Sequence, residues 1–212
     1  MRRQSDHLDD YAAALERLRA AGLVYRCFKT RREVLDDIGR APHGPQSAYV
    51  GAPLAADEES RRLEAGEAFA WRLSLAAARA ALGPAYDALA FNELGCGPAG
   101  ETGLQVARPD QAGDVILARK DLGVAYHLAV VVDDAAQGIT QVVRGEDLFE
   151  AAHVQRLLQA LLGLPTPDYR HHRLLLGPDG KRLAKRDKAE TLAAIRARGV
   201  GAEAVRSDLG FA

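Results

Sequence analysis

The chain has 212 residues, of which 48% are hydrophobic and 27% charged, a balance that predicts one soluble globular domain, or one domain with a substantial insertion. Its formal net charge of −1 excludes a nucleic-acid binder that works through overall charge, so any such function has to depend on local patches. Two cysteines, Cys27 and Cys96, exclude a disulfide framework, and no apolar run in the sequence is long enough to cross a membrane; we therefore expect a cytoplasmic protein without a membrane partner.

The first half of the chain alternates predicted helices with irregular segments. Apolar residues recur at helical spacing over residues 6–21, and Gly22 ends that segment. We expect a short strand or turn over 24–28, short helices near 31–38 and 75–82, and a further helical stretch over 58–71. Two segments, 39–58 and 92–113, are rich in glycine and proline, and the first of them is predicted to be irregular surface structure.

The second half shows a sharper pattern. Strands are predicted over 114–121, 139–145 and 169–176, with a strongly apolar run over 125–138 and a helix over 147–163 between them. A helix over about 189–198 and a short one after it end the chain. This alternation is typical of half of a doubly wound α/β sheet.

A basic stretch, GPDGKRLAKRDKAETL (residues 177–192), follows the last predicted strand. A turn signal at 178–180 precedes four cations within six residues, and such a cluster makes a concentrated positive field suited to phosphate oxygens. By spacing alone, a solvated turn is the commoner interpretation. The four cations are Lys181, Arg182, Lys185 and Arg186.

Two other segments carry candidate ligand-binding residues. The strand over 139–145 delivers Arg144 near its end, where α/β sheets place their ligands, and a guanidinium there could clamp a carboxylate. The alternative is that Arg144 pairs with Glu146 or Asp147 on the surface. Tyr126 either faces a pocket or is a core aromatic with a satisfied hydroxyl. Four histidines lack the spacing of metal ligands: His127, His153, His171 and His172.

These pieces occur in an order that resembles a known family. The runs GVAYHLAVVVDDAAQGITQVVRGEDL and HVQRLLQALLGLPTPDYRHHRLLLGPDGKRLAKRDKAETL are similar to the class I glutamyl-tRNA synthetases, most of all to their short bacterial branch, the glutamyl-Q tRNA(Asp) synthetases. The segment RQSDHLDDYAAALERLRAAGLVYRCF extends the resemblance to essentially the whole chain. The resemblance implies an α/β fold, namely the C-terminal half of a class I synthetase Rossmann-like catalytic domain with an inserted, mostly helical subdomain of the acceptor-binding type.

The implied organisation has three parts. Residues 1–24 are expected to form a helix of the catalytic α/β domain. Residues 25–112 are expected to form the inserted connective subdomain, with a degenerate zinc knob. Residues 113–212 are expected to form the second half of the catalytic domain, including its lysine–serine signature loop.

The resemblance also implies an activity, the ATP-dependent activation of glutamate and its transfer to tRNA, in the short branch to the queuosine base of tRNA(Asp). Tyr126 and Arg144 match the family's glutamate pocket, and Lys185 matches the lysine that contacts ATP and stabilises charge developing on the pyrophosphate. ATP with Mg²⁺ would be a substrate, glutamate and tRNA would be partners, and we expect a monomer. The ATP-binding signature loop corresponds to Arg182, Leu183, Ala184, Lys185 and Arg186, with alanine in place of the usual serine.

Two features depart from the family pattern. The family's zinc knob has Cys-x-Cys followed by Tyr and Cys, whereas here Lys29 stands at the second cysteine and Pro53 at the last. One remaining cysteine, Cys27, cannot hold a structural zinc ion, so we predict no zinc. The family's first strand, Pro-rich loop and histidine–glycine–histidine signature have no counterpart in this sequence, and a chain without them is expected to form little or no adenylate.

Two alternatives stay open. A catalytically inactive tRNA-binding protein would use basic residues of the insertion without forming an adenylate. Translational charging of tRNA(Glu) is disfavoured, because the 27 residues after Lys185 are too few for an anticodon-binding domain. The basic residues concerned are Arg26, Lys29, Arg31, Arg32, Arg61 and Arg62.

Overall fold

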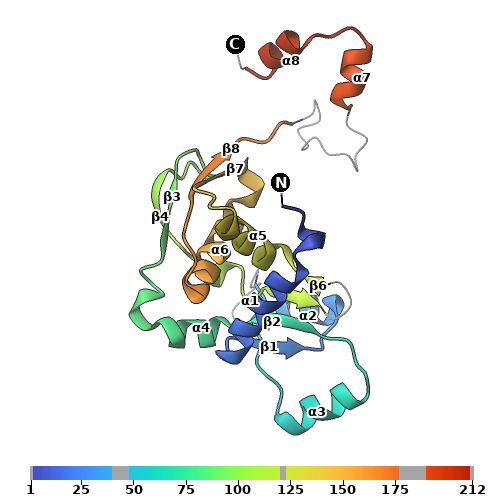
Figure 1. Cartoon of the computed structure of the whole chain (residues 1–212), viewed down its shortest axis with the longest axis vertical. Helices are drawn as coiled ribbons and strands as arrows, with labels where there is room; N and C mark the ends of the chain where they lie inside the picture. Colours follow the sequence, from blue (N-terminus) through green and yellow to red (C-terminus); the bar gives the residue numbers. More distant parts are fainter. Residues whose placement is uncertain (1, 40–47, 120–122, 177–189, 211–212) are drawn as a thin grey trace. The chain divides into compact units, whose positions relative to one another are not determined.

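The structure is a computed structural model, and it describes residues 2–39, 48–119, 123–176 and 190–210. The chain divides into two compact units, residues 1–171 and 172–212. The first unit contains two four-stranded sheets and carries the candidate site (Figure 1).

One sheet is antiparallel and has the order β1-β2-β5-β6. Its strands are β1 (Val24–Cys27), β2 (Ala70–Leu73), β5 (Ile116–Arg119) and β6 (Gly123–Val124). Alternate residues of β1 are buried, as expected for a strand with one face on the core. The sequence pattern placed the strand at 114–121 beside the later strands of an α/β half-sheet, but β5 pairs with β2 and β6 instead.

The other sheet has the order β4-β3-β8-β7, and it carries the candidate site. Its strands are β3 (Ala90–Glu93), β4 (Gly103–Val106), β7 (Gln141–Gly145) and β8 (Asp168–His172). Strands β3 and β4 form an antiparallel pair, whereas β3 runs parallel to β8 with Glu93 opposite Tyr169. Two strands distant in sequence therefore end at the same edge of the sheet.

Three helices pack against one another between the sheets (Figure 1). They are α1 (Leu8–Ala20), α5 (Tyr126–Ala136) and α6 (Phe149–Leu162). Helices α1 and α5 contact the first sheet, and α6 contacts the second. Most apolar residues of α6 are buried, and Gly163 ends the helix in the left-handed conformation that favours glycine. Fully buried leucines such as Leu73, Leu128 and Leu157 bring the two sheets and the helices into one hydrophobic cluster.

Shorter helices complete the first unit, namely α2 (Arg31–Gly39), α3 (Ala56–Glu64) and α4 (Leu75–Leu82). The predicted helix over 75–82 is confirmed as α4, whose N-cap Ser74 accepts a hydrogen bond from the backbone of Ala77. The predicted stretch over 58–71 ends earlier, because Gly66 adopts a φ of 73° and the chain then turns into β2. The β3–β4 pair lies partly in the Gly- and Pro-rich segment, where sequence reasoning assigned no strand.

The carboxylate of Asp114 joins three separate segments of the first unit. It accepts hydrogen bonds from the Tyr25 hydroxyl at 2.9 Å, the Gly51 backbone at 2.9 Å and the Leu75 backbone at 3.0 Å. Arg72 donates to the Asp114 carbonyl oxygen at 2.6 Å. Asp114 is 2% exposed, so its carboxylate depends on these donors in place of water.

The second unit contains α7 (Leu192–Ala197) and α8 (Ala202–Asp208). Thr191 caps α7 through a hydrogen bond from the Ala194 backbone, and Arg198 pairs with Glu190 at 2.7 Å. These helices match the two predicted at the end of the chain.

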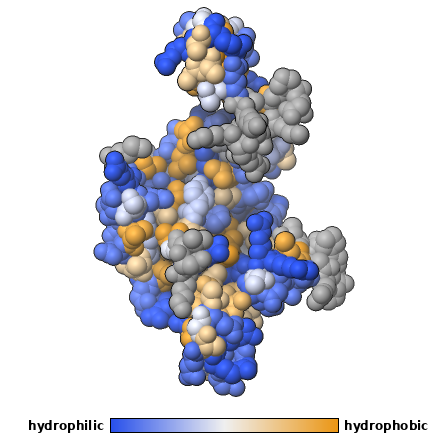
Figure 2. Space-filling view, turned by 90° about the vertical axis from the view of Figure 1, so that its right-hand side faces the viewer, coloured by the Kyte–Doolittle hydropathy of each residue, from blue (hydrophilic) through white to orange (hydrophobic). Residues whose placement is uncertain are grey.

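The described helices are too short or too polar to cross a membrane. Figure 2 shows apolar and polar residues interspersed on one face of the molecule, and the end that carries α3 is largely hydrophilic. The domain boundaries at 24 and 112 remain predictions, since each sheet draws strands from both sides of residue 112.

Replacing Asp114 by alanine is expected to lower the free energy of unfolding by about 2–5 kcal/mol, because three donors lose their acceptor and two of them are buried. Urea denaturation followed by circular dichroism measures this loss. Asp36→Ala, on the exposed side of α2, is the matched control and should change stability by no more than about 0.5 kcal/mol. Equal effects of the two substitutions would contradict the assigned role of Asp114.

Candidate active site

The site forms where three strands of the β4-β3-β8-β7 sheet end. Glu93 is the last residue of β3, and Arg144 and His171 are the next-to-last residues of β7 and β8. The ends of neighbouring strands meet at one edge of a sheet, which is where open α/β sheets bind ligands. Helix α6 adds Gln155, and the first turn of α5 adds Tyr126.

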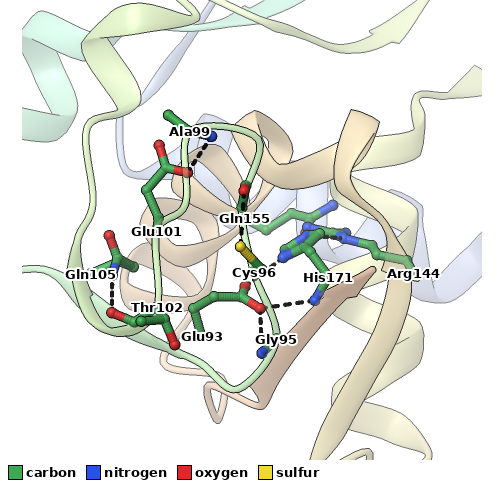
Figure 3. Close-up of polar contacts among 11 residues, drawn as sticks. Glu93, Gly95, Cys96, Ala99, Glu101, Thr102, Gln105, Arg144, Gln155 and His171 are labelled. Atoms are coloured by element: carbon green, nitrogen blue, oxygen red, sulfur yellow. Dashed lines mark hydrogen bonds and ion pairs between the residues drawn. The ribbon is translucent and has the colours of Figure 1, made fainter. Parts of the chain in front are cut away.

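The guanidinium of Arg144 makes the contacts that connect the site, and Figure 3 shows it beside His171. Its Nε donates to His171 Nε2 at 2.9 Å, and its Nη1 donates to Gln155 Oε1 at 2.8 Å. A longer, solvent-exposed contact of 3.4 Å joins Nη1 to the Tyr126 hydroxyl. The guanidinium carbon also lies 5.0 Å from the centre of the Tyr169 ring. Arg144 is therefore fixed by two short bonds and a cation–π contact, with one weaker contact toward solvent.

Glu93 and His171 support Arg144 from the interior. Their side chains are fully buried, and His171 Nδ1 lies 2.5 Å from Glu93 Oε2. The other carboxylate oxygen of Glu93 accepts from the backbone of His171 at 2.9 Å and of Gly95 at 2.8 Å (Figure 3). A buried carboxylate with three donors and a cation nearby is well compensated for its loss of water.

Gly95 is required by this arrangement. A Cβ at that position would lie 2.1 Å from the carbonyl oxygen of His171, and 3.0 Å from the carboxylate of Glu93. The backbone after β3 also bonds to β8 through Leu94, which donates to the Tyr169 carbonyl at 2.7 Å. The close approach of the two segments therefore needs a residue without a side chain.

Some polar groups of the site lack a partner among the described residues. Arg144 Nη2 and Gln155 Nε2 are buried nitrogen donors with no hydrogen bond. A buried donor without an acceptor costs about 1–3 kcal/mol, and more when it is charged. An anion that reaches Arg144 would recover that free energy, and a carboxylate matches the planar fork of a guanidinium.

The field of Arg144 acts on its neighbours. Burial, and secondarily the charge of Arg144, lowers the pKa of His127 below its ordinary value. Burial also raises the pKa of Asp134, although Arg144 opposes that change. Both effects fit a site of low polarity beside a fixed positive charge.

The structure brings together two of the residues predicted from the sequence. Tyr126 and Arg144 are in contact, and Tyr126 is 45% exposed, which excludes the core alternative for its ring. The predicted ATP-binding residues lie outside the described residues, so their role stays a prediction; they are Arg182, Leu183, Ala184, Lys185 and Arg186.

Sequence reasoning missed Glu93, His171, Gln155 and Tyr169. One signal was available in β8, where Tyr169 and His171 alternate with exposed Arg170 and His172. A histidine on the buried side of a strand needs a polar partner inside the protein. No spacing pointed to Glu93 as that partner.

Cys27 is buried, and its Sγ lies 4.0 Å from the Tyr49 hydroxyl. Among the residues that the structure describes, no group of three or more histidine, cysteine, aspartate or glutamate side chains could hold a metal ion. The absence of zinc remains a prediction. Beside Cys27 lies a cavity of about 490 Å³, lined in part by Phe28, Phe69, Lys29 and Arg31.

Most cations of the predicted tRNA-facing insertion have acidic partners. Arg26 pairs with Glu59 at 2.7 Å and also lies over the ring of Trp71, with 4.5 Å between the guanidinium carbon and the ring centre. Arg61 and Arg62 both pair with Glu58. Lys29 pairs with Asp37 at 2.5 Å. Arg31 and Arg32 are the exposed cations of this set that have no partner within the described part of the chain.

Comparison with known proteins identifies the class. The catalytic domain of class I tRNA synthetases (E and Q) matches residues 1–210. The chain therefore belongs to this family, which is a family of ligases. This confirms the predicted family and the predicted α/β fold class.

Three similar relatives carry one name. The glutamyl-Q tRNA(Asp) synthetase of Rhodobacter capsulatus is 44% identical over 221 residues, covering 99% of this chain and 74% of the relative. Those of Nocardia farcinica and Symbiobacterium thermophilum are both 43% identical and match 90% and 98% of this chain. The chain spans only 56% and 61% of the length of these two relatives.

Solved structures agree with the fold. The glutamate-tRNA synthetase of Elizabethkingia anophelis superimposes with a TM-score of 0.64 at 24% identity, over 87% of this chain and 37% of that protein. A glutamate tRNA ligase of Elizabethkingia meningosepticum, solved in complex with its amino acid, gives a TM-score of 0.65 at 25% identity, over 87% of this chain and 36% of that protein.

Replacing Arg144 by glutamine is expected to raise the pKa of His127 toward its ordinary value of about 6.5, because one of the two causes that lower it is removed. Burial remains, so the recovery should be partial. Titration of the histidine ring signals by NMR measures the change. Arg170→Gln removes an exposed arginine of β8 and should leave the pKa of His127 unchanged.

Proposed function

We propose that the chain binds L-glutamate at Arg144 and Tyr126, activates it with ATP and transfers it to tRNA. The observation that carries this proposal is the guanidinium of Arg144, which is held at the ends of the strands with a buried Nη2 that has no partner among the described residues. A carboxylate supplies what this group lacks. The names of the relatives refer to glutamate, which has a second carboxylate that Arg144 could recognise while the first one reacts.

The proposed chemistry has two balanced steps. The α-carboxylate of glutamate attacks the α-phosphorus of ATP, which forms a mixed anhydride and releases pyrophosphate. A nucleophilic group of the tRNA then attacks the activated carbonyl carbon and releases AMP. In this scheme Arg144 binds the side-chain carboxylate, so it orients the substrate and leaves the α-carboxylate available to react.

ATP enters as a substrate together with Mg²⁺. The residue proposed to contact it is Lys185, whose ammonium would stabilise negative charge developing on the leaving pyrophosphate. This assignment rests on the resemblance of residues 182–186 to the family's signature loop.

For the acceptor, we infer the queuosine base of tRNA(Asp). The names of the relatives support it: proteins of that name from several bacteria are 38–44% identical to this chain. Action as a monomer in the cytoplasm is part of the same proposal. A binding-only protein remains the alternative, and measured adenylate formation separates the two.

Glutamate-dependent exchange between ATP and pyrophosphate tests the proposed activation, and the variants are compared in the chain extended upstream by its in-frame coding DNA, since the sequence as given is expected to form little adenylate. Arg144→Lys is expected to lower the exchange rate at subsaturating glutamate on the order of a hundredfold, because lysine keeps the charge but loses the planar fork and the bond to His171. Lys185→Ala should lower the exchange rate at saturating glutamate. Arg170→Gln serves as the control with normal exchange.

Absence of exchange would argue against the activity, provided that the chain extended upstream by its in-frame coding DNA also fails. Binding of tRNA(Asp) without exchange would instead favour the binding-only alternative. Exchange that needs glutamate but survives Arg144→Lys at low glutamate would refute the assigned pocket.

Binding of tRNA is expected to depend on those cations of the insertion that have no acidic partner in the described part of the chain. Removing Arg31 and Arg32 together should weaken binding and reduce the slope of log K against log salt by about 1–2, since each phosphate contact contributes about 0.7–0.9. Removing Arg61 and Arg62, which already share Glu58, should have a smaller effect. Filter binding at several salt concentrations measures both slopes, and the reverse order would refute this reasoning.

A further inference from the structure

The directions of the hydrogen bonds fix the protonation of His171. Arg144 Nε can only donate, so His171 Nε2 has to accept and carries no proton. The proton of the neutral ring then lies on Nδ1 and points at Glu93 Oε2, 2.5 Å away. The site therefore contains a directed chain of hydrogen bonds, in which Arg144 donates to His171 and His171 donates to Glu93.

In this chain of hydrogen bonds, Glu93 can only be the final acceptor. Its two oxygens are occupied by the His171 ring, the His171 backbone and the Gly95 backbone, and its side chain is completely buried. It cannot reach a substrate without breaking all three bonds. The ring of His171 is equally enclosed, packed 5.2 Å from Phe149 and parallel to Tyr169 at 6.0 Å between ring centres.

We propose that Glu93 and His171 are positioning residues, which hold the guanidinium of Arg144 in the orientation that binds a substrate carboxylate. This inference rests on the proposed function, because it takes the ligand of Arg144 to be the carboxylate of glutamate. Glu93 sets the tautomer of His171, and the tautomer leaves an acceptor where Arg144 Nε requires one.

The contacts of Arg144 divide into fixed and replaceable ones. The bonds to His171 and Gln155 are 2.9 and 2.8 Å long, and both are partly buried. The contact with Tyr126 is 3.4 Å long and exposed. Bonds at Nε and Nη1 determine the plane of the guanidinium, so a ligand can replace the weak contact while the plane stays fixed.

Glu93→Gln tests the first link with almost no change of shape. The amide oxygen can still accept from the two backbone donors, but the amide nitrogen now donates toward His171 Nδ1. The ring then has to carry its proton on Nε2, where it opposes the Arg144 Nε donor. We expect the tautomer of His171 to invert and the Kd for L-glutamate to rise on the order of ten- to hundredfold.

His171→Asn tests the second link. Asparagine places an amide donor near the position of Nδ1 and can bond to Glu93, but it offers no acceptor at the position of Nε2. The same rise of the Kd is expected, together with faster hydrogen exchange of the Arg144 Nε proton. His172→Asn changes the exposed neighbour on β8 and is the matched control; it should leave both quantities unchanged.

The measurements are imidazole ¹⁵N chemical shifts at pH 7 and titration with L-glutamate, both by NMR on the full chain. A wild-type His171 with its proton on Nε2, or on both nitrogens, overturns the proposal without any variant, so a failure of Glu93→Gln to fold leaves it testable. An inverted tautomer with an unchanged Kd for glutamate also overturns it. If the wild-type chain has the Nδ1 proton but binds no glutamate, the proposed function fails, and with it the carboxylate assigned to Arg144.

Discussion

The bond from Arg144 to His171 is the interaction on which the site depends. It joins the ends of β7 and β8, and the bond from His171 to Glu93 extends the connection to β3. Each side chain reaches its partner because the strands end close together: β3 ends at Glu93, opposite Tyr169, which lies two residues before His171 on β8. The alignment of the three strands thus determines the orientation of the Arg144 guanidinium.

Compensation of charge explains why the protein can bury Glu93 and His171 beside Arg144. Glu93 and Arg144 carry opposite charges, and the neutral ring of His171 lies between them. A buried carboxylate alone would be costly, but this one has three donors. Among the described residues, Arg144 Nη2 is the charged donor of the site that stays unmatched, and the neutral Gln155 Nε2 lies beside it, so an anionic ligand would act where free energy is uncompensated.

Some of these features could be predicted from the sequence and others could not, and the reasons are physical. Helix α4 was predictable because its alanine-rich composition favours a helix; the structure adds that Ser74 caps its start. Tyr126 and Arg144 were found because a family resemblance carried them, although they lie on different elements. Glu93 and His171 are 78 positions apart, and no periodicity relates them. Their pairing results from the parallel contact of β3 and β8, and β3 adjoins a Gly- and Pro-rich segment that gives no clear strand signal.

In the insertion, by contrast, the sequence suggested a larger anion-binding patch than the structure leaves available. In the sequence its basic residues resemble a tRNA-binding patch. Which of them form ion pairs depends on distances between separate elements, as for Arg26 and Glu59, and sequence spacing does not reveal those distances. A cation already paired with a carboxylate contributes less to phosphate binding, because that pair has to be broken or shared first. In this near-neutral chain, groups that the fold leaves without a partner are the better candidates for binding anions, and both Arg144 Nη2 and the pair Arg31 and Arg32 meet that condition among the described residues.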